Sequence, residues 1–292
     1  MGHFLEILKH TAIDTAKILP FLFLTYLLME YLEHKAGGVL EQRLKKSGRI
    51  GPLFGGLFGV LPQCGFSAAA SGLYSGRIIT TGTLIAVYLS TSDEMLPILL
   101  SSGASLPLIL KLLGTKLLVG LAAGFAVDAI TAAVRRRRHL SAPEMQVDEL
   151  CEREKCGCGD HFVWSALRHT VRIVLFILVF SLLLNLIIHG VGEEKLAKLV
   201  LDRPILGNLL AAILGLIPNC ASSIALTQLY LSGVIPVGAM LSGLFVNSGI
   251  GIAILFRNNR PVRDSWRVLG ILLLVSVAAG VLIDLTPLRG LF

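Results

Sequence analysis

The stretch that decides the fold is GVLPQC at residues 59–64, because it recurs as GLIPNC at residues 215–220. The match extends without a gap over residues 59–128 and 215–284, and it aligns Gly, Pro, Cys, Tyr and Asp in the same order. Chance in an apolar chain aligns Leu with Leu, but it does not align these residue types in order. A duplicated apolar half, interrupted at the same place in each copy, is typical of secondary transporters.

The composition indicates that most of the chain faces lipid or other membrane helices. Of its 292 residues, 54% are hydrophobic and 15% are charged, whereas a soluble domain has about 25% charged residues. Apolar runs at 18–32, 112–127, 173–188 and 268–283 approach the ~20 residues that span the hydrocarbon core. The N-terminal segment MGHFLEILKHTAIDT lacks a basic region followed by a short apolar core, so it does not predict a cleaved signal peptide.

Basic residues gather in three loops, at 35–49, 135–138 and 257–267. The positive-inside rule places such loops in the cytoplasm. The net charge of +7 therefore indicates orientation in a membrane rather than nucleic-acid binding. Loops 101–111 and 190–204 are less basic and are expected outside, as are both termini. Each loop of the first half is then opposite its counterpart in the second half, which predicts inverted repeats.

Residues 51–100 must cross the membrane an odd number of times, because they connect an inner loop with an outer one. Segment 51–76 is rich in glycine and has Pro62 near its middle, and these residues interrupt a helix and permit a sharp turn. About 11 residues on each side rise ~16 Å, half of a ~30 Å hydrocarbon core. The segment predicts a re-entrant hairpin from the cytoplasm, and 204–233 predicts a second from outside, turning at Pro218. A proline-kinked spanning helix is the alternative.

The predicted fold is all-α: a polytopic membrane protein with two inverted-topology repeats, each containing spanning helices and a re-entrant hairpin. Residues 1–132 are the first membrane repeat and residues 163–292 the second. Residues 133–162 form a polar cytoplasmic linker between them.

The predicted substrate site lies at mid-membrane, where the hairpin tips meet polar interruptions in the following helices. The helix predicted at 79–100 contains TSDE at 91–94, and the helix predicted at 234–256 contains NSG at 247–249. Backbone groups and helix ends at such breaks replace part of an ion's hydration shell. The candidate pathway residues are Pro62, Gln63, Cys64, Ser67, Thr91, Ser92, Asp93, Glu94, Pro218, Asn219, Cys220, Ser222, Ser223, Asn247 and Ser248.

Two pairs in this set carry most of the expected chemistry. Asp93 and Glu94 have no acidic counterparts in the second repeat, and carboxylates inside a membrane are costly and usually functional. The alternative places them at the boundary, facing extracellular water. Cys64 and Cys220 are repeat equivalents whose thiolates suit soft or borderline ions, whereas oxygen ligands suit harder ions such as Mn²⁺. The alternative treats each cysteine as a small buried hydrophobe.

The linker contains a second candidate metal site, formed by Cys151, Cys156, Cys158 and His161 in CEREKCGCGDH. Three thiols and an imidazole this close together suffice to surround one tetrahedral ion, and a reducing cytoplasm disfavours a disulfide. The alternative is a disordered linker with incidental cysteines. No cofactor is expected apart from a transition-metal ion that these four linker residues could bind. The sequence shows no phosphate loop, metalloprotease helix or nucleophile elbow, so an enzyme is not expected.

The paired Pro-x-Cys turns, the Cys/His-bearing linker and the duplicated apolar halves resemble the ArsP-related family of heavy-metal exporters with ten membrane helices. Members of this family are also described as manganese transporters or arsenic efflux proteins. Three spanning helices and two hairpin arms in each repeat fit ten helices. The resemblance implies metal or metalloid efflux, with Cys64, Cys220, Gln63 and Asn219 along the pathway.

The predicted function is secondary-active export of a divalent metal or metalloid by alternating access, coupled to protons. An anion or organic-solute carrier is one alternative, because the N-termini of the hairpin arms attract anions. A membrane scaffold or metal sensor without transport is another. The expected partners are the lipid bilayer and a small inorganic ion, with no nucleic acid and with a homo-oligomer left open. The expected location is the inner (plasma) membrane of a bacterial or archaeal cell.

Overall fold

The structure is a computed structural model that describes residues 50–60, 64–92, 95–137, 204–218 and 220–286, with isolated positions within 20–27 and 167–179. All regular structure in this described part is helical. Four stretches of it are long and apolar enough to cross a membrane, namely Thr81–Ser101, Leu106–Arg137, Val237–Asn258 and Val262–Leu285. The prediction of an all-α chain with apolar helices of membrane-spanning length is confirmed.

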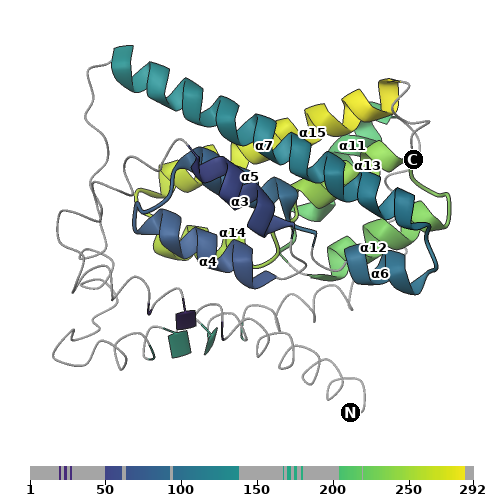
Figure 1. Cartoon of the computed structure of the whole chain (residues 1–292), viewed down its shortest axis with the longest axis horizontal. Helices are drawn as coiled ribbons and strands as arrows, with labels where there is room; N and C mark the ends of the chain where they lie inside the picture. The colour runs from purple at the N-terminus through teal and green to yellow at the C-terminus, as the bar shows by residue number, and fades with distance from the viewer. Residues whose placement is uncertain are drawn as a thin grey trace.

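The described helices form two sets with the same order (Figure 1). The first set is α3 (Gly51–Gly59), α4 (Cys64–Ser75), α5 (Thr81–Ser90), α6 (Met95–Ser101) and α7 (Leu106–Arg137). The second set is α11 (Pro204–Gly215), α12 (Cys220–Leu231), α13 (Val237–Val246), α14 (Gly251–Asn258) and α15 (Val262–Leu285). The equivalent pairs are α4 and α12, α5 and α13, α6 and α14, and α7 and α15. In each pair, the first residues of the two helices are separated by the same offset as the sequence repeat.

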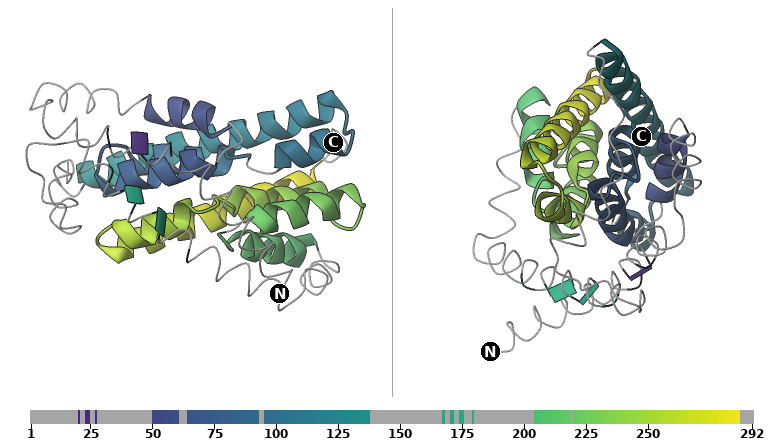
Figure 2. Two further views of the ribbon diagram at one scale, coloured as in Figure 1. Left: turned by 90° about the horizontal axis from the view of Figure 1, so that it is seen from below. Right: turned by 90° about the vertical axis from the view of Figure 1, so that its left-hand side faces the viewer.

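Helices α5 and α13 form the interior of the bundle, and α7 and α15 lie along them on the outside (Figures 1 and 2). Every residue of α13 is buried, as is every residue of α5 after Thr81. The long helices instead expose large apolar side chains, with Leu118 on α7 68% exposed and Leu274 on α15 70% exposed. Apolar side chains on an outer surface suit helices that face lipid.

Each interior helix crosses its long neighbour at a pair of glycines. A methyl group added at Gly82 would overlap the carbonyl oxygen of Gly124, and one at Gly238 would overlap that of Gly280. The two backbones therefore approach as closely as they do only because these residues lack a side chain, as is common between membrane helices.

A carboxylate next to each crossing explains why an aspartate recurs in the repeat. Asp128 accepts a hydrogen bond from the Gly82 amide at 2.8 Å, and Asp284 accepts one from the Gly238 amide at 2.9 Å. Amides in the first turn of a helix have no partner within the helix. The long helix thus supplies the N-terminal acceptor, which matters most in α13, because its N-cap residue is Pro236 and has no side-chain acceptor.

Helix α3 lies along α5 over its whole length, and the far end of α4 lies beside the start of α5. Gly51 packs against Thr83 near the start of α5, and Gly59 packs against Ser90 at its end. At the other end of α4, the Tyr74 hydroxyl lies 3.3 Å from Thr81 Oγ1. The outer ends of α3 and α4 therefore lie at the same end of the bundle.

The second set has the same arrangement at the opposite end. Asn208 on α11 donates to Asp284, at the far end of α15, over 2.8 Å, and Gly215 packs against Gly243 in the last turn of α13. The two sets also interlock, because α4 packs against α14 and α12 packs against α6 (Figure 1).

The long helices run in opposite directions (Figures 1 and 2). Tyr74 donates to Asp264, near the start of α15, while Thr80 donates to Asp128, in the last third of α7. Helix α7 also continues to Arg137, a few residues into the range expected as linker. The remainder of that linker, 138–162, lies outside the described residues.

Candidate functional site

Both interior helices are interrupted where the sequence places polar residues. Helix α5 ends at Ser90 and α6 begins at Met95, while α13 ends at Val246 and α14 begins at Gly251. The residues that follow α5 and α13 are nearly inaccessible, with exposures of 2% for Thr91, 3% for Ser92, 3% for Asn247 and 1% for Ser248. Non-helical backbone at membrane depth is tolerated only where protein buries it or it lines a polar path.

The first break is tied to the end of α3. Ser92 Oγ donates to the carbonyl oxygen of Val60 over 2.6 Å, so the second residue after α5 contacts the residue after α3. The side chain of Thr91 turns back and donates to Val87 O over 2.7 Å. Ser92 therefore lies against Val60, the residue after α3, while the predicted turn residues Pro62 and Gln63 lie outside the described part of the chain.

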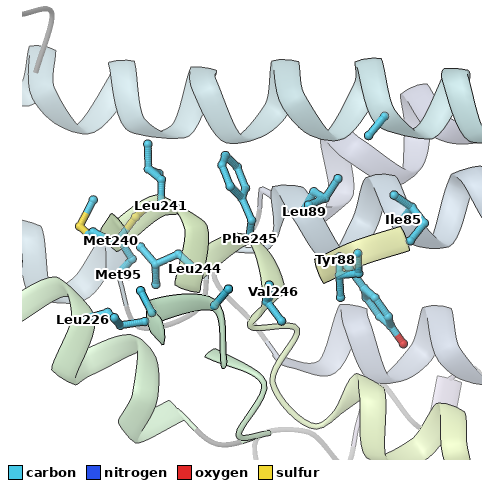
Figure 3. Close-up of a cluster of buried hydrophobic side chains, with 14 of the residues drawn as sticks. Ile85, Tyr88, Leu89, Met95, Leu226, Met240, Leu241, Leu244, Phe245 and Val246 are labelled. Carbon is cyan, nitrogen blue, oxygen red and sulfur yellow. The ribbon is translucent and has the colours of Figure 1, made fainter. Parts of the chain in front are cut away.

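A polar cluster lies next to this break, between α4, α5 and α14. Ser71 Oγ lies within donor distance of Ser67 O at 2.6 Å and Gly251 O at 2.8 Å, and it is 2.7 Å from the Tyr88 hydroxyl. Figure 3 shows the Tyr88 hydroxyl pointing away from the apolar side chains around it. Ser67, predicted as a pathway residue, thus lies in a contact that joins the first half to the start of α14.

The second break is tied to the segment between α11 and α12. Asn247 Nδ2 donates to Ser222 Oγ over 3.0 Å, and Asn247 Oδ1 accepts from the Gly249 amide at 2.9 Å. Ser222 Oγ in turn donates to Ile217 O, next to Pro218, over 3.2 Å. The structure therefore brings together Asn247, Ser222 and Ile217, the residue before Pro218.

Ser248 differs from its repeat equivalent. Its hydroxyl oxygen is buried and has no hydrogen-bond partner among the described residues, whereas Ser92 donates to Val60. A buried hydroxyl without a partner costs about 1–3 kcal/mol, which makes Ser248 a candidate ligand-binding residue. Ser223, in the first turn of α12, is also buried, and its carbonyl accepts from Thr227 Oγ1 at 2.7 Å.

Several predicted site residues fall outside this geometry. Pro62, Gln63, Asp93, Glu94, Asn219 and the linker residues Cys151, Cys156, Cys158 and His161 lie outside the described residues. Cys64 and Cys220 are placed by their backbone, as the first residues of α4 and α12. Within the described ranges, no group of three or more His, Cys, Asp and Glu side chains is close enough to hold a metal ion. The linker metal site therefore stays a prediction.

A buried lysine lies between the two halves near the second break. Lys116 on α7 is 1% exposed, and its Nζ donates to the carbonyl oxygen of Leu244 on α13 over 2.7 Å. The ammonium also lies 5.3 Å from the ring centroid of Phe245, a distance suited to a cation–π contact. Figure 3 shows the Phe245 ring pointing toward the long helix α7.

An ion pair joins the two halves at one end of the bundle. Arg77 Nη1 donates to Asp264 Oδ2 over 2.8 Å, and Arg77 Nη2 donates to Arg260 O over 2.8 Å. Tyr74 donates to the same Asp264 oxygen over 2.8 Å. Burial by itself lowers the pKa of the Arg77 guanidinium, but the hydrogen bond with Asp264 and the attraction of its charge raise the pKa above its ordinary value.

Comparison with known proteins decides the family. The model of a family described as "Putative, 10TM heavy-metal exporter" matches residues 6–181 and 144–256, which is most of the chain. The chain belongs to this family. No curated protein and no solved structure matches it. The resemblance read from the duplicated Pro-x-Cys turns is thereby confirmed, and the protein is an integral membrane protein of a heavy-metal exporter family.

Sequence reasoning missed two contacts in this protein, although each involves a residue that stands out in the sequence. Lys116 interrupts an otherwise apolar run, and a charge inside a membrane helix is functional by default. Arg77 stands where the second copy has Gly233, so it is a departure from the repeat in a turn. The sequence therefore identifies both residues as unusual, but it does not predict which residue each of them contacts.

Proposed function

We propose that the protein exports a divalent metal or metalloid ion by alternating access, coupled to protons, through the region where α5 and α13 are interrupted. The observation that carries this proposal is the convergence of two buried polar breaks, after Ser90 and after Val246, on the inner ends of the short helices. A scaffold gains nothing from interrupting its two most buried helices at equivalent points. Membership of a heavy-metal exporter family supports the same direction.

We infer that α3 with α4, and α11 with α12, are re-entrant hairpins of two inverted repeats. In support, the outer ends of each pair lie at one end of the bundle, and the two pairs lie at opposite ends. The opposed directions of α7 and α15 also support inversion (Figure 2). The end that holds Arg77, Arg135–Arg137 and Arg260 is the cytoplasmic one by the positive-inside rule.

The ligands that the pathway offers to a cation are oxygen atoms with two thiols nearby. Ser92, Asn247 and Ser248 supply hydroxyl and amide oxygens at the breaks, while Cys64 and Cys220 begin the second arm of each pair. Oxygen ligands favour Mn²⁺, and thiolates favour softer ions, including arsenic(III) species. Asp93 and Glu94, next in sequence after Ser92, are the proposed sites where proton and metal compete.

An anion carrier is the second candidate, because one observation favours it. The ammonium of Lys116 is buried close to the second break, and a buried positive charge attracts an anion. The N-termini of α4, α12 and α14 lie next to the breaks, and helix N-termini also attract anions.

Uptake into inverted membrane vesicles tests the proposal, because export then becomes uptake. We expect uptake of Mn²⁺, Zn²⁺ or arsenite that depends on an opposing proton gradient, and we expect Asp93→Asn or Glu94→Gln to abolish that pH dependence. The double variant Cys64→Ser with Cys220→Ser serves to test ligand softness, with Zn²⁺ uptake falling more than Mn²⁺ uptake. Uptake of phosphate without uptake of any metal would establish the anion carrier instead.

A further inference from the structure

Helix α13 ends at the break, and the carbonyl of Leu244 near its C-terminus is therefore left without a donor from within the helix. Asn247 N, the cap amide, donates to Gly243 O, so the next carbonyl would need the amide of Ser248 in a continued helix. The helix stops at Val246, and the last carbonyls of a helix have no intrahelical donor. Lys116 Nζ supplies a donor at 2.7 Å.

The lysine supplies a charge as well as a donor. The C-terminus of a helix carries a partial negative charge, and this one lies in the interior, with Leu244 3% and Phe245 0% exposed. The Phe245 ring presents its π face 5.3 Å from the same ammonium. The end of α13 therefore has a cation already in place, tethered to α7 by the lysine side chain.

The equivalent position in the other half has an apolar residue. By the repeat, Lys116 corresponds to Leu272 on α15, which is 0% exposed. Leu244 corresponds to Tyr88 on α5. The residues after the two helices differ in charge as well, because Asp93 and Glu94 follow α5 where neutral residues follow α13. Positive charge is thus built in at the end of α13, and negative charge is encoded after α5.

We propose that Lys116 is a tethered cation that occupies one of two equivalent helix ends, so that the transported cation binds only at the other, at the end of α5 beside Thr91 and Ser92. This inference rests on the proposed function of cation export. It makes Lys116 a specificity-determining residue: it limits the pair of breaks to one mobile cation and decides which half holds it.

The test compares Lys116→Met, which removes the charge at similar length, with Lys116→Arg, which keeps it. Lys111→Met, an exposed lysine on the same helix, is the matched control. The purified full-length protein is heated with and without MnCl₂, and the Mn²⁺-induced rise in Tm is measured. We expect Lys116→Met to have the lowest Tm without metal and the largest rise with Mn²⁺, because the ion takes the place of the ammonium. The linker cysteines are identical in all variants, so the comparison isolates position 116.

A second variant keeps the test decisive if Lys116→Met does not fold. Leu272→Lys places a second tethered cation at the end of α5, and we expect Mn²⁺ uptake into inverted vesicles to fall about tenfold or more, because like charges exclude each other from one site. Equal Mn²⁺ responses in Lys116→Met and Lys116→Arg, or unchanged uptake by Leu272→Lys, would overturn the inference. A wild-type protein that transports no cation, beside a Lys116→Met that gains a Mn²⁺ response, would overturn the proposed function alone.

Discussion

Arg77 holds a backbone conformation that normally favours glycine. Its φ is 59°, and the equivalent residue in the second half is Gly233 with a φ of 73°. A side chain in this left-handed region costs about 1–2 kcal/mol. The cost is offset here because the guanidinium reaches Asp264 and the Arg260 carbonyl in the other half. The strained backbone of Arg77 therefore allows its side chain to link the two halves at the basic end of the bundle.

This exchange predicts unequal effects of removing either partner. Arg77→Gly loses the ion pair but relieves the backbone, whereas Asp264→Asn keeps the strain and leaves a half-buried guanidinium without its carboxylate. We expect Asp264→Asn to lower Tm more than Arg77→Gly does. Thermal unfolding of both variants and of the double variant measures the difference. A larger loss in Arg77→Gly would show that the left-handed turn is not strained.

At the scale of helices, the crossings of α5 with α7 and of α13 with α15 are close backbone contacts that recur in both repeats. Gly82 and Gly238 lie in the first turns of α5 and α13, each against a carbonyl oxygen of the long helix. The backbone amide of the same glycine donates a hydrogen bond to Asp128 or Asp284. Position and capping of each interior helix are thus set together by the long helix beside it.

These crossings predict that Gly82→Ala and Gly238→Ala destabilise the protein by about 1–3 kcal/mol each, the usual range for overpacking. The controls are Gly114→Ala and Gly270→Ala, which are repeat equivalents in α7 and α15 where an added methyl group meets nothing within 4 Å. Alanine there is favoured by helix propensity by about 1 kcal/mol. Thermal unfolding in detergent should separate the two pairs. Equal Tm values for all four variants would contradict the close approach.

At the scale of the whole molecule, charge differs between the two ends of the bundle. Arg77, Arg260 and the end of α7 with Arg135–Arg137 lie at one end. The turns after α6 and α12 lie at the other end and carry serine and glycine. Because the two halves contribute to both ends, we expect the charge difference to orient the whole bundle rather than either repeat alone.

The orientation predicts the labelling of single cysteines introduced into a cysteine-free background. Cysteines at Arg136 and Arg263 should react with a membrane-impermeant thiol reagent only from the cytoplasmic side, because basic segments stay inside. Cysteines at Ser102 and Ser232 should react only from the outer side. These four positions are exposed, so accessibility reports the side rather than burial. Reaction of Ser102 and Ser232 variants from opposite sides would refute inverted repeats.

Local pattern was sufficient for the helices and their breaks. The polar residues that begin at Thr91 and at Asn247 predicted the interruptions that separate α5 from α6 and α13 from α14. Such an interruption depends only on neighbouring residues along the chain. The sequence repeat predicted equivalent helices, because similar local sequences form similar helices. Helix α7 continues through the first arginines of the expected linker to Arg137, because arginine is a good helix former. The boundaries of the two membrane repeats stay predictions.

The sequence by itself determined the membrane environment, the duplication and the places where helices break, because hydropathy, proline and glycine act over a few residues. Only the tertiary structure identified the partners of the charged residues that differ between the two repeats. Lys116 meets a carbonyl 128 residues away, and Arg77 meets a carboxylate 187 residues away. Such pairs depend on how two halves pack, and a buried charge selects its partner only when the fold has excluded water.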